Sequence, residues 1–181
     1  ALTFLPPKEP YKLVANIPYY ITSPILNHFL CEQPESCRPT SLTLLVQKEV
    51  AEKIVAASKA NKANHSVLSL QVHMFGTPKI VAIVPPSHFT PAPKVDSAIL
   101  HIERHPPLLP DSDLEPFFKL LHVGFSHHRK KLIRNLCGLG WLQFDDLQKI
   151  FAKCTLNENI RAEDLSLKEW KQLYAATWEK H

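Results

Sequence analysis

The segment Asn16–Tyr19, with the sequence Asn-Ile-Pro-Tyr, constrains the fold more than any other part of the chain. It directly follows residues 13–15, a short apolar run that is typical of a buried strand. Pro18 lacks an N–H and has a fixed φ, so strand pairing must stop there. We therefore expect Asn16 and Tyr19 to lie at the carboxyl end of a strand, where open α/β sheets bind their ligands.

The residue types of this segment suit the handling of a nucleobase amine. Such an amine is a poor nucleophile because its lone pair is delocalised into the base. The Asn16 side-chain oxygen and the Ile17 carbonyl can accept its two hydrogens, and Tyr19 can stack on a base extruded from its helix. The alternative is a strand that ends in an ordinary proline turn, and these four residues alone do not decide between the two.

The order of the expected elements indicates an α/β part followed by an all-α part. We expect a helix after residue 21, strands at 42–46, 79–84 and 95–102, helices at 48–57 and 67–74, and then helices near 113–123, 128–138, 144–153 and 167–178. The last two strands should form an antiparallel pair. Residues 106–110 are typical of a linker, which predicts one domain at 1–105 and a helical domain at 106–181.

Phe89 lies in the middle of a connection, residues 85–94, that contains four prolines. So many prolines predict a stiff, extended loop in place of a tight hairpin turn. An apolar ring on such a loop either packs into the core or serves as a stacking surface. The pattern alone slightly favours the core.

A basic segment lies in the helical part. Five Lys or Arg and no Asp or Glu occur between residues 116 and 140, and four of them are Arg129, Lys130, Lys131 and Arg134. Cations at the start of a helix oppose its dipole, so a cluster there indicates another role. Binding of phosphates is one interpretation, and a solvated helix face is an equally good one.

Composition limits the class of protein. The net charge of +4 and the pI of about 8.9 are compatible with an anionic partner. The cysteines have neither C-x-x-C nor zinc-site spacing, which predicts reduced thiols in a cytosolic protein and no metal site. They are Cys31, Cys37, Cys137 and Cys154. We find no secretory leader pattern and no apolar run of the roughly 18 residues that a membrane span needs, so we expect a cytoplasmic protein without a membrane anchor.

Five segments, taken in order, resemble the ribosomal RNA adenine dimethyltransferases of the bacterial kasugamycin-sensitivity type. They are residues 16–19 (Asn-Ile-Pro-Tyr), 47–50 (Gln-Lys-Glu-Val), 89–98 (Phe-Thr-Pro-Ala-Pro-Lys-Val-Asp-Ser-Ala), 125–135 (Phe-Ser-His-His-Arg-Lys-Lys through Arg-Asn) and 161–166 (Arg-Ala-Glu-Asp-Leu-Ser). The resemblance implies the C-terminal half of a Rossmann-like class I methyltransferase sheet, followed by a small all-α domain.

The resemblance also implies an activity and roles for single residues. The family dimethylates N6 of two adjacent adenosines in small-subunit ribosomal RNA with S-adenosylmethionine. Asn16 and the Ile17 carbonyl would hold the target amine, Pro18 would fix the turn, and Tyr19 and Phe89 would sandwich the base. Asn16 would also lie beside the cofactor. The reaction is a displacement at the sulfonium methyl group, so positioning would carry most of the catalysis.

The same resemblance assigns the RNA contacts. Arg129, Lys130, Lys131 and Arg134 would hold the backbone of the RNA, with Lys94 as a further cation beside the base-binding loop. Such contacts position an enzyme without reading sequence. The expected partner is the small ribosomal subunit, and the expected state is a monomer.

The glycines depart from the family pattern. The chain has four glycines, none in a G-x-G arrangement, although a nucleotide-like cofactor is usually approached by a glycine-rich loop. We therefore expect the N-terminal cofactor-binding half to be lacking, and the chain alone to bind S-adenosylmethionine weakly and to be inactive. Two alternatives stay open: a non-catalytic RNA-binding or ribosome-assembly factor, and a resistance methyltransferase that acts on large-subunit RNA.

Overall fold

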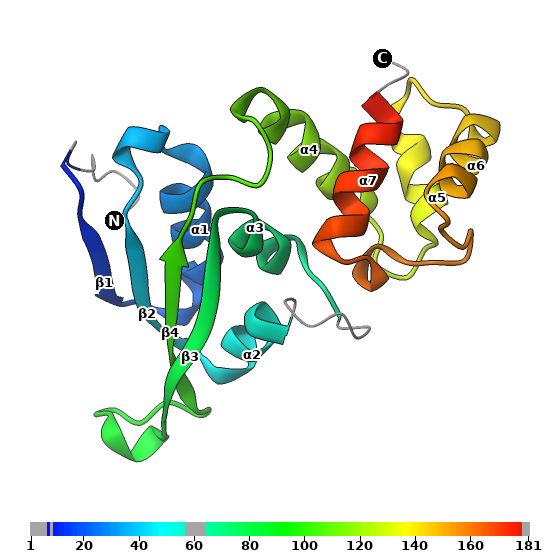
Figure 1. The fold of residues 1–181 in the computed structure, drawn as a ribbon. Coiled ribbons are helices and arrows are strands. Elements are labelled where there is room, and N and C mark those ends of the chain that lie inside the picture. Colours follow the sequence, from blue (N-terminus) through cyan, green and yellow to red (C-terminus); the bar gives the residue numbers. More distant parts are fainter. Residues whose placement is uncertain (1–6, 8, 57–63, 179–181) are drawn as a thin grey trace. The chain divides into compact units, whose positions relative to one another are not determined.

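The computed structural model describes residues 7, 9–56 and 64–178. These residues form two compact units (Figure 1). The first comprises the described residues up to 56 together with 68–108, and the second comprises 64–67 together with 109–178.

The first unit is built on a mixed sheet of four strands in the order β1-β2-β4-β3. The strands are β1 (Lys12–Asn16), β2 (Ser41–Gln47), β3 (Gly76–Val84) and β4 (Ser97–Arg104). β1 runs parallel to β2, whereas β4 is antiparallel to both β2 and β3. The expected antiparallel pair of β3 and β4 is therefore confirmed.

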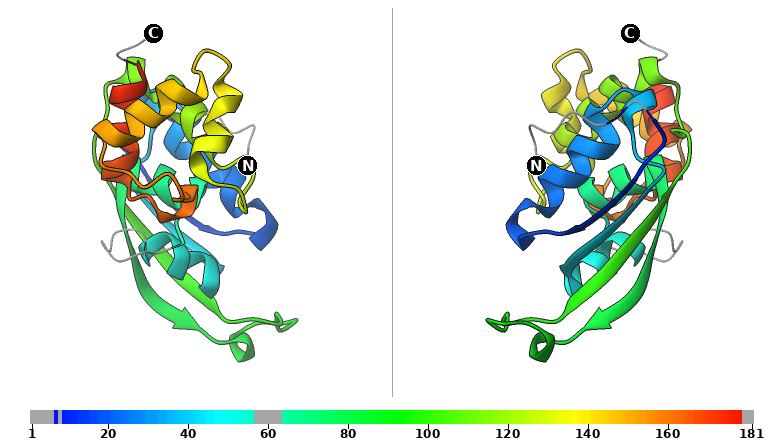
Figure 2. Two further views of the ribbon diagram at one scale, coloured as in Figure 1. Left: turned by 90° about the vertical axis from the view of Figure 1, so that its right-hand side faces the viewer. Right: turned by 90° about the vertical axis from the view of Figure 1, so that its left-hand side faces the viewer.

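Three helices cover one face of this sheet (Figures 1 and 2). They are α1 (Thr22–Asn27), which continues as a π-helical turn at His28–Glu32, α2 (Lys48–Ala56) and α3 (Val67–Phe75). The core lies between them and the two central strands. The side chains of Leu42, Leu44 and Val46 on β2 and of Leu100 and Ile102 on β4 are fully buried there. Their alternation follows the period of two that a strand with one covered face requires.

The strand at residues 13–15 is present, but its predicted burial is wrong. β1 is an edge strand of the described sheet, and the side chain of Val14 is 75% exposed. The apolar run identified the strand correctly. It did not reveal that β1 pairs with a single described neighbour and that one face of it is uncovered.

Residues 85–96 connect β3 to β4 at the far end of a long antiparallel ribbon (Figure 1). A short 3-10 helix at Pro86–His88 begins the connection, and the rest is irregular. Phe89 is half-buried on this loop. The slight preference for a core position was therefore wrong, because the prolines hold the loop beyond the helices that would have covered the ring.

The second unit is a bundle of helices, as predicted. Its helices are α4 (Asp111–Gly124), α5 (Leu132–Leu136), α6 (Phe144–Lys153) and α7 (Leu167–Trp178), with 3-10 turns at Cys137–Leu139 and Ala162–Asp164. The bundle closes around Trp170, Phe117 and Phe151, whose side chains are fully buried. Phe125 stacks on Trp170 with 5.7 Å between the ring centroids.

The helix expected at 128–138 is much shorter in the structure. Lys131 has extended backbone angles (φ −62°, ψ 142°), so α5 begins at Leu132. The N–H of Leu132 donates to the carbonyl of Ile160, 2.9 Å away. Arg129 and Lys130 consequently lie in a turn that precedes the helix.

The cysteines form no disulfide. Cys31 is largely buried on the π-helical turn, and this burial raises the pKa of its thiol to about 12. The side chain therefore stays protonated at neutral pH and acts as a small apolar group.

The packing of Gly124 against Trp170 yields a stability prediction. A Cβ at Gly124 would collide with Cη2 of the buried Trp170 ring and would lie 3.0 Å from Cδ1 of Leu132. We expect Gly124→Ala to lower the free energy of unfolding by about 1–3 kcal/mol, because neither neighbour can move without opening the core. Urea denaturation measures this decrease. Gly138→Ala is the matched control, since its Cβ would meet nothing closer than 3.5 Å; equal decreases in both variants would contradict the packing argument.

Candidate base-binding site

A pocket of about 370 Å³ lies at the carboxyl end of β1 in the first unit. The residues that line it come from the end of β1 and from the β3–β4 connection. They are Asn16, Ile17, Pro18, Tyr19, Phe89, Pro91 and Pro93. The structure thus brings together all five residues that were predicted to handle the base, although Phe89 is far from the other four in the sequence.

The turn after β1 is fixed by its own hydrogen bonds. Pro18 has an extended ψ of 135° and is followed by a 3-10 turn at Tyr19–Ile21. The N–H of Ile21 donates to the Pro18 carbonyl at 3.1 Å, and the Thr22 hydroxyl donates to the Tyr19 carbonyl at 2.9 Å. The strand end is therefore held in one conformation, with Asn16 exposed at the pocket.

Tyr19 is anchored at its far end. Its hydroxyl is 2.5 Å from the hydroxyl of Ser97, the fully buried first residue of β4. This bond fixes the direction of the Tyr19 ring and joins the end of β1 to the start of β4. Sequence analysis did not single out Ser97, although it lies in the segment 89–98 that carries the family resemblance.

The wall opposite to this turn is made by the proline loop. The N–H of Phe89 donates to the Pro86 carbonyl at 3.1 Å, which holds the start of the loop. Pro91 and Pro93 add rigid apolar surface beside the Phe89 ring. The pocket therefore offers two aromatic rings and one amide, and none of the described residues that line it is charged.

Lys94 is not among the residues that line this pocket. It lines a separate hollow of about 500 Å³ with Lys48 and Asp96. The ammonium group of Lys48 is 3.3 Å from a carboxylate oxygen of Asp96 in that hollow. The expected RNA contact of Lys94 therefore lies beside the base-binding pocket and not in it.

The cations of the basic segment are exposed, as expected. Arg129, Lys130 and Lys131 form no ion pair with any other described residue. Arg134 differs from them, because its guanidinium lies 4.6 Å from the centroid of the Phe144 ring. That contact fixes the side chain on the bundle without neutralising its charge.

The described residues do not fit S-adenosylmethionine. The glycines have structural roles: Gly76 lies against Ile102 and Glu103 in the sheet, Gly124 lies against Trp170, and Gly140 ends a 3-10 turn with a φ of +85°. None of them lines the pocket at the end of β1. Asn16 is the residue at the pocket that was expected to contact the cofactor, and the described residues that line the pocket include no carboxylate to bind a ribose.

The described part of the chain contains no group of three or more His, Cys, Asp or Glu side chains arranged to hold a metal ion. A helix with the length and apolar character needed to cross a membrane does not occur among the same residues.

The sequence and the fold are similar to those of ribosomal RNA methyltransferases. A chain named ribosomal RNA small subunit methyltransferase A from Lactococcus lactis is 43% identical over 173 residues, and one from Streptococcus pneumoniae is 42% identical over 175. The 23S rRNA methyltransferase ErmE is 26% identical, with a TM-score of 0.72 over 97% of this chain and 68% of its own. A dimethyladenosine transferase from Plasmodium falciparum, 24% identical over 99% of this chain and 70% of its own, shares the fold with a TM-score of 0.75.

These similarities define an α/β methyltransferase fold. The family model described as ribosomal RNA adenine dimethylase matches residues 3–177. The chain belongs to this family of enzymes.

The extent of these matches bears on the expectation that the family's N-terminal half is lacking. The family model takes in nearly the whole chain, so the expectation that the family's N-terminal half is lacking is not upheld by this match. The alignment covers 94% of this chain and 57% of the Lactococcus relative. The chain thus spans less than two thirds of the length of the relatives it matches.

The bond between Tyr19 and Ser97 yields a second stability prediction. We expect Ser97→Ala and Tyr19→Phe each to lower the free energy of unfolding by about 1 kcal/mol, because each removes the same hydrogen bond. The double variant should be little less stable than either single one, and a double-mutant cycle by urea denaturation measures this coupling. In the control cycle, Tyr20→Phe replaces Tyr19→Phe, since the Tyr20 side chain is 85% exposed. Additive effects for Ser97 and Tyr19 would show that the bond is not formed in solution.

Proposed function

We propose that this chain binds and orients the target adenine in the N6-dimethylation of two adjacent adenosines of small-subunit ribosomal RNA, with S-adenosylmethionine as the methyl donor. The observation that carries this proposal is the pocket in which Asn16, Tyr19 and Phe89 meet. Its walls suit a flat aromatic ligand, and its polar groups suit an exocyclic amine.

The Asn16 side-chain oxygen and the Ile17 carbonyl accept the two hydrogens of N6. This favours a pyramidal nitrogen whose lone pair is no longer shared with the ring. Tyr19 and Phe89 stack on the two faces of the base, and such stacking is worth roughly 1–3 kcal/mol per base. Pro18 fixes the backbone between Asn16 and Tyr19. These residues act by positioning the amine, and no strong base is required.

The choice of the small-subunit RNA follows from the relatives. Those named for the small subunit are 40–43% identical to the chain, whereas ErmE, named for 23S rRNA, is 26% identical. A large-subunit resistance methyltransferase is therefore the weaker candidate. A non-catalytic RNA-binding or assembly factor is favoured by one observation, the misfit of the described residues to S-adenosylmethionine.

The helical unit supplies the RNA contacts in this proposal. Arg129, Lys130, Lys131 and Arg134 bind backbone phosphates, and Lys94 binds RNA close to the target base. Residues 1–105 then serve as the catalytic part and residues 106–181 as the RNA-binding part. The protein acts as a monomer on small ribosomal subunits in the cytoplasm.

The role of Asn16 is tested in cells. We expect a chromosomal Asn16→Ala substitution to reduce N6-dimethylation of the two adjacent small-subunit adenosines by about 100-fold or more, because the amine is no longer held. Mass spectrometry of ribosomal RNA measures this, with Gln143→Ala, an exposed amide on the other unit, as the control. Unchanged methylation in Asn16→Ala would exclude the proposed role. Loss of methyl groups from large-subunit RNA would favour the resistance enzyme.

The phosphate contacts are tested by salt dependence. We expect charge reversal of Arg129 and Lys130 to weaken binding of small-subunit RNA at all sequences. The slope of log affinity against log salt concentration should become shallower by about 0.7–0.9 for each phosphate that is no longer neutralised. Fluorescence anisotropy at several KCl concentrations measures both. The control is Lys149→Glu, an exposed cation on α6. If the slope falls equally in the control, net charge and not a local contact explains the effect.

A further inference from the structure

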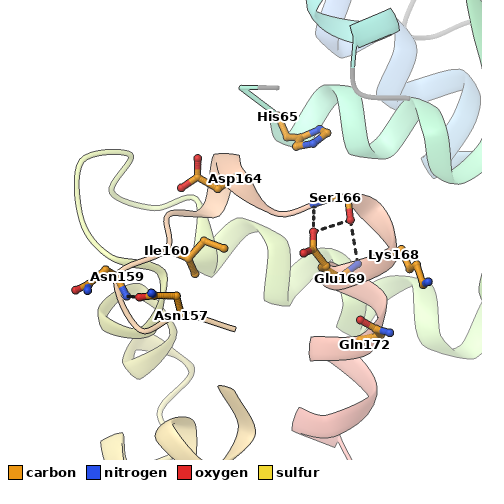
Figure 3. Close-up of a pocket in the computed structure, with 9 residues that line it drawn as sticks. All are labelled: His65, Asn157, Asn159, Ile160, Asp164, Ser166, Lys168, Glu169 and Gln172. Atoms are coloured by element: carbon orange, nitrogen blue, oxygen red, sulfur yellow. Dashed lines mark hydrogen bonds between the residues drawn. The ribbon is translucent and has the colours of Figure 1, made fainter. Parts of the chain in front are cut away.

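The second unit contains a pocket of about 820 Å³, lined mainly by residues with polar side chains, that the proposed chemistry does not use. Figure 3 shows its walls, which come from the segment before α7, from the start of α7 and from His65. The residues that line it are His65, Asn157, Asn159, Ile160, Asp164, Ser166, Lys168, Glu169 and Gln172. Its volume is in the range of pockets that hold small molecules.

The carboxylates of the pocket are engaged in holding the backbone. Glu169 accepts hydrogen bonds from the N–H and the hydroxyl of Ser166, at 2.8 and 2.6 Å (Figure 3). Asp164 accepts one from the N–H of Arg161 at 3.0 Å. These bonds stabilise the starts of α7 and of the 3-10 turn before it. Their negative charge also disfavours a phosphate inside the pocket.

The amides of the pocket are available to a ligand. The side chains of Asn159 and Gln172 form no hydrogen bond with another described residue, and Asn157 uses its oxygen to accept from the N–H of Asn159 at 2.8 Å. Amides both donate and accept, so they match the edges of nucleobases better than they match anions or apolar groups. Lys168 adds one cation at the rim.

The basic segment adjoins this pocket. Ile160 lines the pocket, and its carbonyl accepts from the N–H of Leu132, the residue that directly follows Arg129, Lys130 and Lys131. The backbone that follows these cations is thus hydrogen-bonded to a segment that lines the pocket, so an RNA strand whose phosphates lie along them would pass close to it. An unpaired nucleotide can turn its base into such a hollow, whereas a paired one cannot.

We propose that this pocket binds the base of one unpaired nucleotide, next to backbone phosphates held by Arg129, Lys130 and Lys131. The assignment rests on the proposed function in one respect, the identity of the ligand as RNA. It gives the helical unit a preference for unpaired segments, which phosphate contacts alone cannot supply.

The test compares two RNAs of equal length, a hairpin with a single-stranded loop and a fully paired duplex, by fluorescence anisotropy with the whole chain. We expect the double variant Asn159→Ala, Gln172→Ala to weaken binding of the hairpin by about 5- to 10-fold and to leave binding of the duplex unchanged, because only the unpaired base reaches the amides. Gln143→Ala is the matched control. Its side chain makes no capping hydrogen bond at the start of α6.

The outcomes separate the two proposals. Selective weakening for the hairpin supports the pocket. Equal affinity of the double variant and the unaltered chain for the hairpin overturns the pocket and leaves the proposed function standing. Equal loss of affinity for the hairpin and the duplex also overturns the pocket proposal, because the amides would then contact only the RNA backbone. Failure of the unaltered chain to bind either RNA overturns both proposals.

Discussion

The hydrogen bond between the hydroxyls of Tyr19 and Ser97 is the interaction on which the proposed base-binding site depends. It links the end of the edge strand β1 to the start of the central strand β4. Because Ser97 is fully buried, the bond ties an exposed, ligand-facing turn to the rigid core of the sheet. The Tyr19 ring can therefore serve as a fixed surface, and the pocket needs no rearrangement to present Asn16 and Phe89 together.

In the proposed function, the two units divide the recognition of RNA between them. The pocket on the first unit has rings and an amide and no charge on the described residues that line it, so it can select a base but gains little from phosphates. The second unit has exposed cations beside a pocket rich in amides. Electrostatic attraction supplies affinity and salt dependence, whereas base contacts supply selectivity. Separate variants can thus change one property without the other.

Most elements could be predicted because their causes are local. The apolar runs of β2 and β4 and the periodicity of α6 and α7 identify these elements within a few residues. Burial of β1 and of Phe89 could not be predicted, because it depends on which neighbours cover a strand or a loop. The short α5 was missed because the N–H of Leu132 bonds to Ile160, a partner far along the chain that no periodicity contains. Ser97 could have been noticed through its place in the segment 89–98 that carries the family resemblance, but its bond to Tyr19 joins residues 78 positions apart and leaves no local signal.

The prolines of the base-binding pocket have a consequence for selectivity. Pro18, Pro91 and Pro93 have little backbone freedom before a ligand arrives, so binding costs the protein little conformational entropy. In the proposed function, the remaining cost falls on the nucleic acid, which must unstack and unpair the base that enters. Differences in binding affinity among adenines should then follow the free energy needed to unstack and unpair each one. A rigid pocket would therefore favour adenines in the least stable parts of the RNA.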